Sequence, residues 1–214
     1  IFPDANISEA SIISSFAGLR PIVRGDANNP SAESRAHLVL EEDGLVTITG
    51  GKLTIFEKMA EDALKAAIPQ IGSELKQIDH WFDPLPRNLP DGKLPAESVH
   101  YLAGRYGQAL PDLVDLSEPE DLKPVDGLNA HWAEVTFNAR FGMVEHLDDL
   151  LLRRTRLGML LPEGGMGVLE KVKALAGSEL PWSDEEWQSE ISRYKTIYYQ
   201  AYSPNPENYL KQEK

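Results

Sequence analysis

The sequence contains no cysteine, and this absence excludes several kinds of chemistry together. Without thiols the chain has no disulfide framework, no thiolate ligand for a metal ion and no cysteine nucleophile. It also lacks any run of roughly 18 uncharged apolar residues, which is the length that a membrane-spanning helix needs. These absences leave a globular protein whose core must be held together by ordinary packing.

Positive charge is scarce as well. The chain has 21 Lys and Arg residues against 34 Asp and Glu residues, for a net charge of −13. Nucleic-acid binding needs a basic surface, so this balance argues against nucleic acid as a partner. With 42% hydrophobic residues over a length of 214, the chain can form one large domain or two small ones. The first residue is Ile1, and no signal peptide follows it, so we expect a piece of a longer polypeptide.

Several functional motifs are missing. The Gly-x4-Gly-Lys-Ser/Thr phosphate loop, the Gly-x-Gly-x-x-Gly dinucleotide fingerprint and the Gly-x-Ser-x-Gly nucleophile elbow do not occur. The chain has five histidines, and none has the i, i+4 spacing of a helical metal site. We therefore predict no metal site and no hydrolase-type nucleophile.

The first third of the chain predicts a small strand and helix unit. Residues 36–40 and 45–49 are rich in β-branched and leucine residues and flank the dipeptide Asp43-Gly44, which favours a hairpin turn. Apolar residues at helical spacing over 55–68 predict a helix with a wide buried face. Thr54 is its predicted N-cap, and Pro69 and Gly72 are expected to close it.

The remainder is predicted to be helical. Four prolines between residues 79 and 95 indicate a linker, after which helices are expected over 95–106, 111–116, 130–144, 146–157, 167–176 and 183–202. Ser183 and Glu186 have the capping-box spacing at the start of the last helix. We predict a mostly α (α+β) fold, with short antiparallel strands and one helix in residues 1–78 and a bundle of about five helices in residues 79–214.

Two helical segments carry more specific expectations. Residues 146–156 begin with acids and end with bases, which complements the helix dipole, and Asp149 can pair with Arg153 one turn later. We interpret this segment as a self-stabilised helix. The glycine-rich residues 164–167 follow no predicted strand, so we interpret them as a flexible loop before the next helix.

The most informative pattern is Gly50-Gly51-Lys52, which lies between a predicted strand and a predicted helix. Two glycines allow close approach to the backbone, and a helix N-terminus offers N–H groups and a positive dipole end to an anionic ligand. The alternative is a tight turn with a solvated lysine, which the spacing alone favours. An anion could similarly be bound by three arginines, Arg20, Arg24 and Arg35. The alternative is that these arginines form ordinary ion pairs with surface carboxylates. His37, in an apolar strand, is expected to be a hydrogen-bonded structural residue.

Several stretches, taken in order, resemble one known family. Residues 15–21, Ser-Phe-Ala-Gly-Leu-Arg-Pro, are similar to the Gly-[Leu/Ile/Val]-Arg-Pro motif of FAD-dependent glycerol-3-phosphate dehydrogenases, and residues 34–37 resemble the Ser-Arg-x-His element that follows it. Residues 45–54 with 58–61 resemble the family's last FAD-domain strand, turn and helix. Residues 133–135 and 147–158 are similar to its helical C-terminal domain.

The resemblance implies a flavoenzyme that oxidises sn-glycerol 3-phosphate to dihydroxyacetone phosphate and passes electrons to a membrane quinone. It assigns Arg20 and Arg35 to the phosphorylated substrate. It assigns Gly50, Gly51, Lys52, Leu53 and Thr54 to the pyrimidine edge of the FAD isoalloxazine. It also implies a homodimer in the cytoplasm, or a peripheral protein at the inner face of the cell membrane.

Two departures from the family pattern shape these expectations. Ile55, Phe56 and Glu57 stand where the family usually has a Thr or Ser, a Tyr and an Arg. The alternative interpretation is therefore a helical interaction or oligomerisation domain of another, amino-acid-oxidase-like FAD enzyme. The dinucleotide-binding βαβ unit is also missing from this sequence. We therefore expect FAD to be bound only by the full-length protein, and the isolated chain to be inactive.

Overall fold

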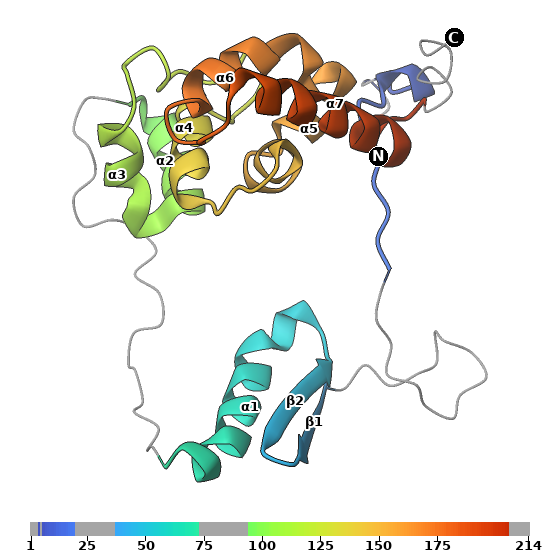
Figure 1. Ribbon diagram of the computed structural model, residues 1–214, viewed down its shortest axis with the longest axis vertical. Helices are drawn as coiled ribbons and strands as arrows, with labels where there is room; N and C mark the ends of the chain where they lie inside the picture. Colours follow the sequence, from blue (N-terminus) through green and yellow to red (C-terminus); the bar gives the residue numbers. More distant parts are fainter. Residues whose placement is uncertain (1–3, 5, 20–36, 73–93, 206–214) are drawn as a thin grey trace. The chain divides into compact units, whose positions relative to one another are not determined.

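The computed structural model describes residues 4, 6–19, 37–72 and 94–205. The chain separates into two compact units, one formed by Ile1–Ala17 with Phe82–Lys214 and the other by Gly18–Trp81. We call these the helical unit and the hairpin unit. Their described parts confirm the predicted fold class, because a two-stranded antiparallel sheet is accompanied by many helices (Figure 1).

The hairpin unit consists of β1 (His37–Glu42), β2 (Leu45–Gly50) and α1 (Phe56–Ile71). The strands pair in register from His37 opposite Gly50 to Glu42 opposite Leu45. Asp43 and Gly44 both have positive φ, at 49° and 83°, as a two-residue hairpin turn of the type I′ class requires. The hairpin is therefore confirmed, and its register follows from this turn.

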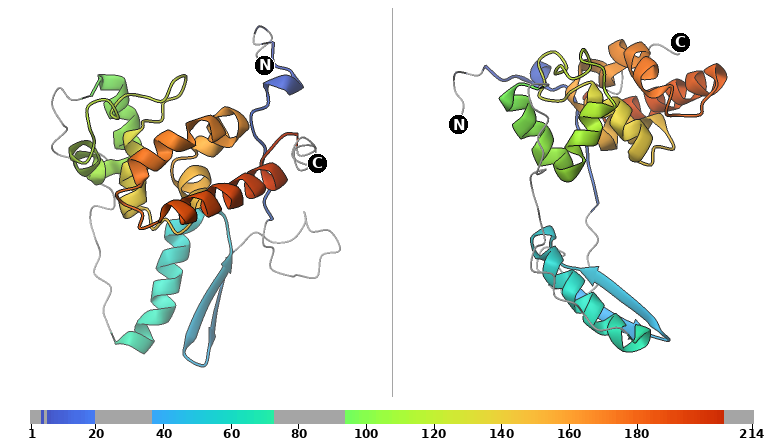
Figure 2. Two further views of the ribbon diagram at one scale, coloured as in Figure 1. Left: turned by 45° about the horizontal axis from the view of Figure 1, so that its top comes forward. Right: turned by 90° about the vertical axis from the view of Figure 1, so that its left-hand side faces the viewer.

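One face of the hairpin lies against α1 in each view (Figures 1 and 2). Val39, Val46 and Ile48 are half-buried there, whereas Leu38 and Leu40 on the other face are about two-fifths exposed, at 42% and 40%. The helix ends as predicted at Gly72, which takes the left-handed conformation with φ 64°. Pro69 does not close it, because Pro69 lies inside α1, which continues to Ile71. The expected wide buried face is wrong, however, because α1 has no buried residue.

The start of α1 also differs from the prediction. The chain first forms a 3₁₀ turn over Leu53–Ile55, and the N-cap of α1 is Ile55 without a side-chain hydrogen bond. Thr54 is therefore not the N-cap. The tight turn takes up the residues that the capping-box spacing had assigned to the first helical turn.

The helical unit contains, within residues 94–205, six α-helices. They are α2 (Ala96–Tyr106), α3 (Leu110–Asp115), α4 (Ala133–Phe141), α5 (Leu157–Leu160), α6 (Leu169–Ala176) and α7 (Asp184–Ala201). Short 3₁₀ helices cover Gly107–Ala109 and Pro162–Val168, and another, Glu9–Ser11, lies near the start of the chain. The predicted capping box of α7 is confirmed, since Ser183 and Glu186 exchange hydrogen bonds of 3.2 and 2.7 Å.

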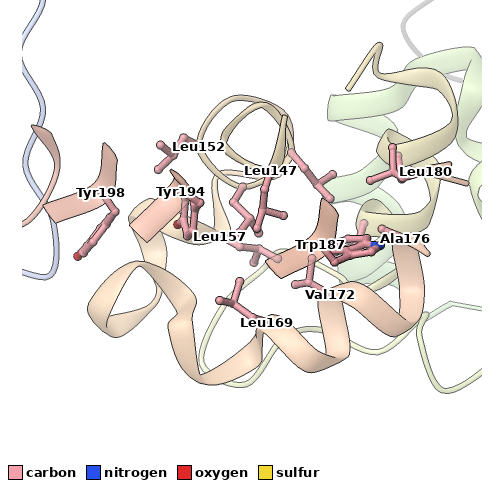
Figure 3. Close-up of a cluster of buried hydrophobic side chains, with 14 of the residues drawn as sticks. Leu147, Leu152, Leu157, Leu169, Val172, Ala176, Leu180, Trp187, Tyr194 and Tyr198 are labelled. Atoms are coloured by element: carbon pink, nitrogen blue, oxygen red, sulfur yellow. The ribbon is translucent and has the colours of Figure 1, made fainter. Parts of the chain in front are cut away.

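Two clusters of buried side chains form the core of the helical unit. The larger contains Leu147, Leu157, Val172, Trp187 and Tyr194, contributed by α5, α6, α7 and the segments before α5 (Figure 3). The smaller joins α2 and α3 to Ala133 and Phe137 of α4. All the buried hydrophobic residues among the described ones lie between Leu94 and Tyr199, so this unit holds the whole of the described core.

Residues 146–157 do not form the single α-helix that was predicted. The segment Asp149–Arg154 is a π-helix, Arg156 takes a left-handed φ of 60°, and α5 follows as a separate short helix. Asp149 and Arg153 do pair, at 3.0 Å, as expected. Buried Asp148 also accepts hydrogen bonds from Arg153 and from Arg193 of α7, so the wider π turn is tied to a distant helix.

The glycine-rich residues 164–167 are not an open loop. Gly164 and Gly165 are buried and have positive φ of 67° and 73°, and the Tyr194 hydroxyl donates a hydrogen bond to the Gly164 carbonyl. A Cβ on Gly164 would lie 2.7 Å from the Tyr198 ring. Glycine is therefore required here by close packing against α7.

Candidate functional site

The turn between β2 and α1 is built on two left-handed glycines. Gly50 and Gly51 have φ of 75° and 78°, a conformation that costs free energy for other residues. A Cβ on Gly51 would overlap the Met59 sulfur and would lie 3.2 Å from the Cβ of His37. Position 51 therefore needs glycine both for its backbone angle and for its close contact with the helix and the first strand.

After the glycines the backbone passes through Lys52 into the 3₁₀ turn that precedes α1. Lys52 is extended, with φ −133°, and the Ile55 N–H donates to the Lys52 carbonyl at 3.0 Å. The side chains of Lys52, Leu53 and Thr54 are exposed, with Leu53 as a whole 88% exposed. The first N–H groups of a helix and its positive dipole end favour negative charge or an electron-rich edge. Gly50–Thr54 thus form one exposed turn with the chemistry of an anion-binding backbone.

A polar cluster lies behind this turn. His37 Nε2 and Asp62 Oδ2 are 2.8 Å apart, which joins the start of β1 to the middle of α1. Lys58 Nζ donates to the other Asp62 oxygen at 2.8 Å. These hydrogen bonds, first from Lys58 and then from His37, hold the pKa of the Asp62 carboxyl below its usual range. His37 is thus hydrogen-bonded, as the sequence indicated.

Asp62 and Met59 were not predicted as part of the site. Both lie on α1, three residues apart, and this spacing places them on neighbouring positions of one helix face. Their relation to Gly51 and His37 depends on how the helix folds back onto the hairpin, which the sequence pattern does not specify. Arg20 and Arg35, the predicted substrate-binding residues, lie outside the described residues.

A second polar cluster is buried inside the helical unit. Glu134 is fully buried and accepts hydrogen bonds from the Tyr106 hydroxyl and the His131 N–H, at 2.8 and 3.0 Å, while Arg105 pairs with it at 2.9 Å. Burial raises the pKa of the Glu134 carboxyl and of the Tyr106 hydroxyl. Asn138 donates to Tyr106 at 2.8 Å. Arg105 and Tyr106 of α2 thus bind Glu134 and Asn138 of α4, and the cluster joins these two helices.

Within the described ranges, no group of three or more His, Asp or Glu side chains is arranged to hold a metal ion. The same ranges contain no helix that is long and apolar enough to span a membrane.

Comparison with known proteins identifies the family to which the strand, the turn and the following helices belong. Residues 46–187 match the model of a family described as the C-terminal domain of alpha-glycerophosphate oxidase. The match runs from β2 into α7. The chain therefore belongs to this family.

The relatives that the chain resembles are glycerol-3-phosphate dehydrogenases. It is 27% identical to the mitochondrial glycerol-3-phosphate dehydrogenase of Macaca fascicularis, over 92% of this chain and 30% of the relative. It is 29% identical to glycerol-3-phosphate dehydrogenase 2 of Mycobacterium tuberculosis (strain ATCC 25618 / H37Rv), over 88% of this chain and 35% of the relative. The human mitochondrial enzyme is 27% identical over 92% and 30%. The chain thus spans about a third of the length of these relatives.

Proposed function

We propose that the protein carrying this chain is an FAD-dependent dehydrogenase that oxidises sn-glycerol 3-phosphate to dihydroxyacetone phosphate and passes the electrons to a quinone. The observation that carries the proposal is the exposed Gly50–Thr54 turn, with its two left-handed glycines, in a member of the glycerophosphate oxidase C-terminal family. The resemblance of the relatives, which are named glycerol-3-phosphate dehydrogenases, supports it. This chain has no cysteine, so none of its own residues offers a thiol for the electron transfer.

The residues of the turn fit a flavin. FAD, when bound, supplies the two-electron acceptor. The backbone N–H groups of Gly50–Thr54 would face its pyrimidine edge, where the positive end of α1 favours the negative charge of the reduced ring. The glycines allow the left-handed backbone angles on which this turn is built. Arg20 and Arg35 would bind the substrate phosphate, because a guanidinium group can donate two parallel hydrogen bonds to two phosphate oxygens.

We further propose that residues 1–78 complete the FAD and substrate domain of the full-length protein and that residues 79–214 form its helical C-terminal domain. Ile1–Ala17, although assigned to the first domain, pack with the helical unit in this structure. A homodimer at the cytoplasmic face of the membrane is part of the same proposal. Light scattering and co-sedimentation of the full-length protein with lipid vesicles would test these two features. A monomer, or a protein that stays in the supernatant, would contradict the corresponding part.

The decisive experiment uses the full-length protein, purified and assayed with glycerol 3-phosphate and a dye acceptor. We expect a visible flavin absorbance band that glycerol 3-phosphate bleaches under anaerobic conditions. Because hydrogen bonds to charged groups contribute about 1.5–3 kcal/mol, Arg20→Ala and Arg35→Ala should raise KM by about tenfold or more. Arg24→Ala is the matched control and should leave KM unchanged.

The alternative substrate is an amino acid, and the departure at Ile55, Phe56 and Glu57 is the observation that favours it. The same full-length protein is therefore assayed with a panel of amino acids. Bleaching of the flavin by an amino acid, but not by glycerol 3-phosphate, would replace the proposed substrate and leave the flavin assignment intact. A full-length protein without flavin would overturn both.

A further inference from the structure

A polar link joins the sheet of the hairpin unit to its helix. His37 begins β1 and lies opposite Gly50, the last residue of β2, in the strand register. Its ring reaches across to Asp62 on α1, with 2.8 Å between Nε2 and Oδ2. A carboxylate can only accept, so His37 Nε2 carries the hydrogen of this bond. The link therefore connects the strand that supports Gly50 to the helix that follows Thr54.

The same two elements also enclose Gly51. The Cβ position of Gly51 meets the Met59 side chain from α1 and the His37 Cβ, 3.2 Å away, from β1. Met59 lies three residues before Asp62 on the helix. Gly51 therefore packs against His37 from the strand and Met59 from the helix. The His37–Asp62 hydrogen bond joins this strand to this helix.

We infer that His37 and Asp62 are positioning residues for the Gly50–Thr54 turn, fixing its backbone N–H groups in the orientation that binds the flavin. The inference rests on the proposed function for the identity of the ligand. Neither residue touches the ligand, and both act through the turn.

The burial of the hairpin unit explains why this link matters. None of the described residues in its strands or in α1 is buried, so apolar packing alone holds the helix weakly against the hairpin. The side chains of His37 and Asp62 are 18% and 26% exposed, which is more sheltered than the Lys58 and Glu61 side chains on the same helix, at 56% and 49%. A sheltered hydrogen bond is stronger than an exposed one.

The test compares variants of the full-length protein. His37→Ala and Asp62→Ala should each weaken FAD binding by about tenfold, the effect of losing the hydrogen bond between them. Asp62→Ala also removes the acceptor of the Lys58 hydrogen bond. His37→Gln keeps an N–H donor and Asp62→Asn keeps an oxygen acceptor, so both should stay within about threefold of the wild type. The measurements are the FAD dissociation constant from flavin fluorescence and the reduction potential of the bound flavin, which should become more negative in the alanine variants.

Glu61→Ala is the matched control. It removes a neighbouring carboxylate that pairs with Lys58 and Lys65 but that makes no recorded bond to His37. Its FAD affinity and flavin potential should equal those of the wild type. Unchanged affinity and potential in both alanine variants would overturn the inference. Equal losses in the alanine variants and in Gln and Asn variants would also overturn it, because packing rather than the hydrogen bond would then be the cause.

A second measurement does not depend on flavin. In the 214-residue chain, the amide signals of Gly50 and Gly51 in ¹H–¹⁵N spectra should shift in His37→Ala and Asp62→Ala and should not shift in Glu61→Ala. Unshifted signals in the alanine variants would overturn the link between the pair and the turn. If the full-length wild type binds no flavin, the proposed function fails and the positioning role fails with it, whereas the amide shifts still decide the structural link.

Discussion

A buried glycine in the helical unit allows two of its helices to pack closely. Gly158 of α5 is buried, and a Cβ there would overlap the Tyr194 hydroxyl and would lie 2.9 Å from Leu152 Cδ2. Protein interiors are close-packed, so an added methyl group must displace its neighbours. Gly158 therefore allows α5 to approach α7.

Gly158→Ala should lower the free energy of unfolding of the helical unit by about 1–3 kcal/mol, the usual cost of overpacking. The measurement is urea unfolding followed by circular dichroism at the helix band. Gly104→Ala in α2 is the matched control, because a Cβ there meets nothing within 4 Å. The control should be more stable than the wild type by about 0.5–1 kcal/mol, because alanine favours helix interiors. Equal effects at the two positions would contradict the packing argument.

At the scale of elements, the π-helix Asp149–Arg154 is held by charges from two directions. Asp148, which precedes it, is buried and accepts hydrogen bonds from Arg153 and Arg193. Burial alone would raise the pKa of the Asp148 carboxyl, but the two guanidinium groups outweigh burial and hold this pKa below its usual value. The π-helix and α7 are thereby joined by a buried ionic group.

The lowered pKa of Asp148 predicts how acid affects the stability of the folded protein. Because the folded-state pKa of Asp148 is lower than its unfolded-state value, its contribution is complete above about pH 4 and is lost as the pH falls through the folded-state pKa. Asp148→Asn should therefore be less stable at neutral pH and should lose less stability below about pH 4 than the wild type. Urea unfolding between about pH 2.5 and about pH 7, a range that extends below and above the usual pKa of an aspartate carboxyl, is the measurement. Asp184→Asn, whose side chain is 89% exposed, is the control and should follow the wild-type curve.

These elements show which features were predictable. The turn at Asp43-Gly44, the C-cap at Gly72 and the capping box at Ser183 depend on neighbouring residues, so local sequence rules predict them. The π-helix depends on Arg193, which lies about 45 residues from Asp148, and a local pattern of acids followed by bases favours an ordinary α-helix instead. Gly164 likewise needs Tyr194 and Tyr198 of α7 to explain why it is packed.

The candidate site divides in the same way. The strand, the two glycines and the presence of a helix after them were predicted from adjacent residues, but the N-cap was not, because a 3₁₀ turn over Leu53–Ile55 precedes the helix. The bond from His37 to Asp62 and the contact of Met59 with Gly51 were not, because they join residues of different elements. For Arg20 and Arg35 the predicted role stays a prediction.

At the scale of the whole molecule, the two units differ in how much they bury. The described core lies between Leu94 and Tyr199, whereas α1 and the two strands have no buried residue. Amide hydrogen exchange reports this difference, because protection follows local burial and hydrogen bonding. In the 214-residue chain we expect the slowest-exchanging amides in α4, α6 and α7 and faster exchange throughout β1, β2 and α1.

Hydrogen exchange followed by mass spectrometry of peptides is the measurement. Protection in α1 equal to that in α7 would contradict the prediction. Urea titration provides a check. The fluorescence of Trp187, in the helical core, should change at a higher urea concentration than the one at which α1 loses its exchange protection.

The order of the chain has a consequence for its synthesis. The first residues belong to the helical unit, where the Ser15 N–H donates to the Tyr202 carbonyl at 2.8 Å and the Tyr198 hydroxyl donates to the Ile13 carbonyl at 3.1 Å. Ile13 and Tyr198 are 185 residues apart. At about 5–20 residues per second, a ribosome needs roughly 10–40 s to add that length. During this interval the Ile13 carbonyl has no Tyr198 hydroxyl to accept from, so the contact between these two distant segments can form only after α7 has been synthesised.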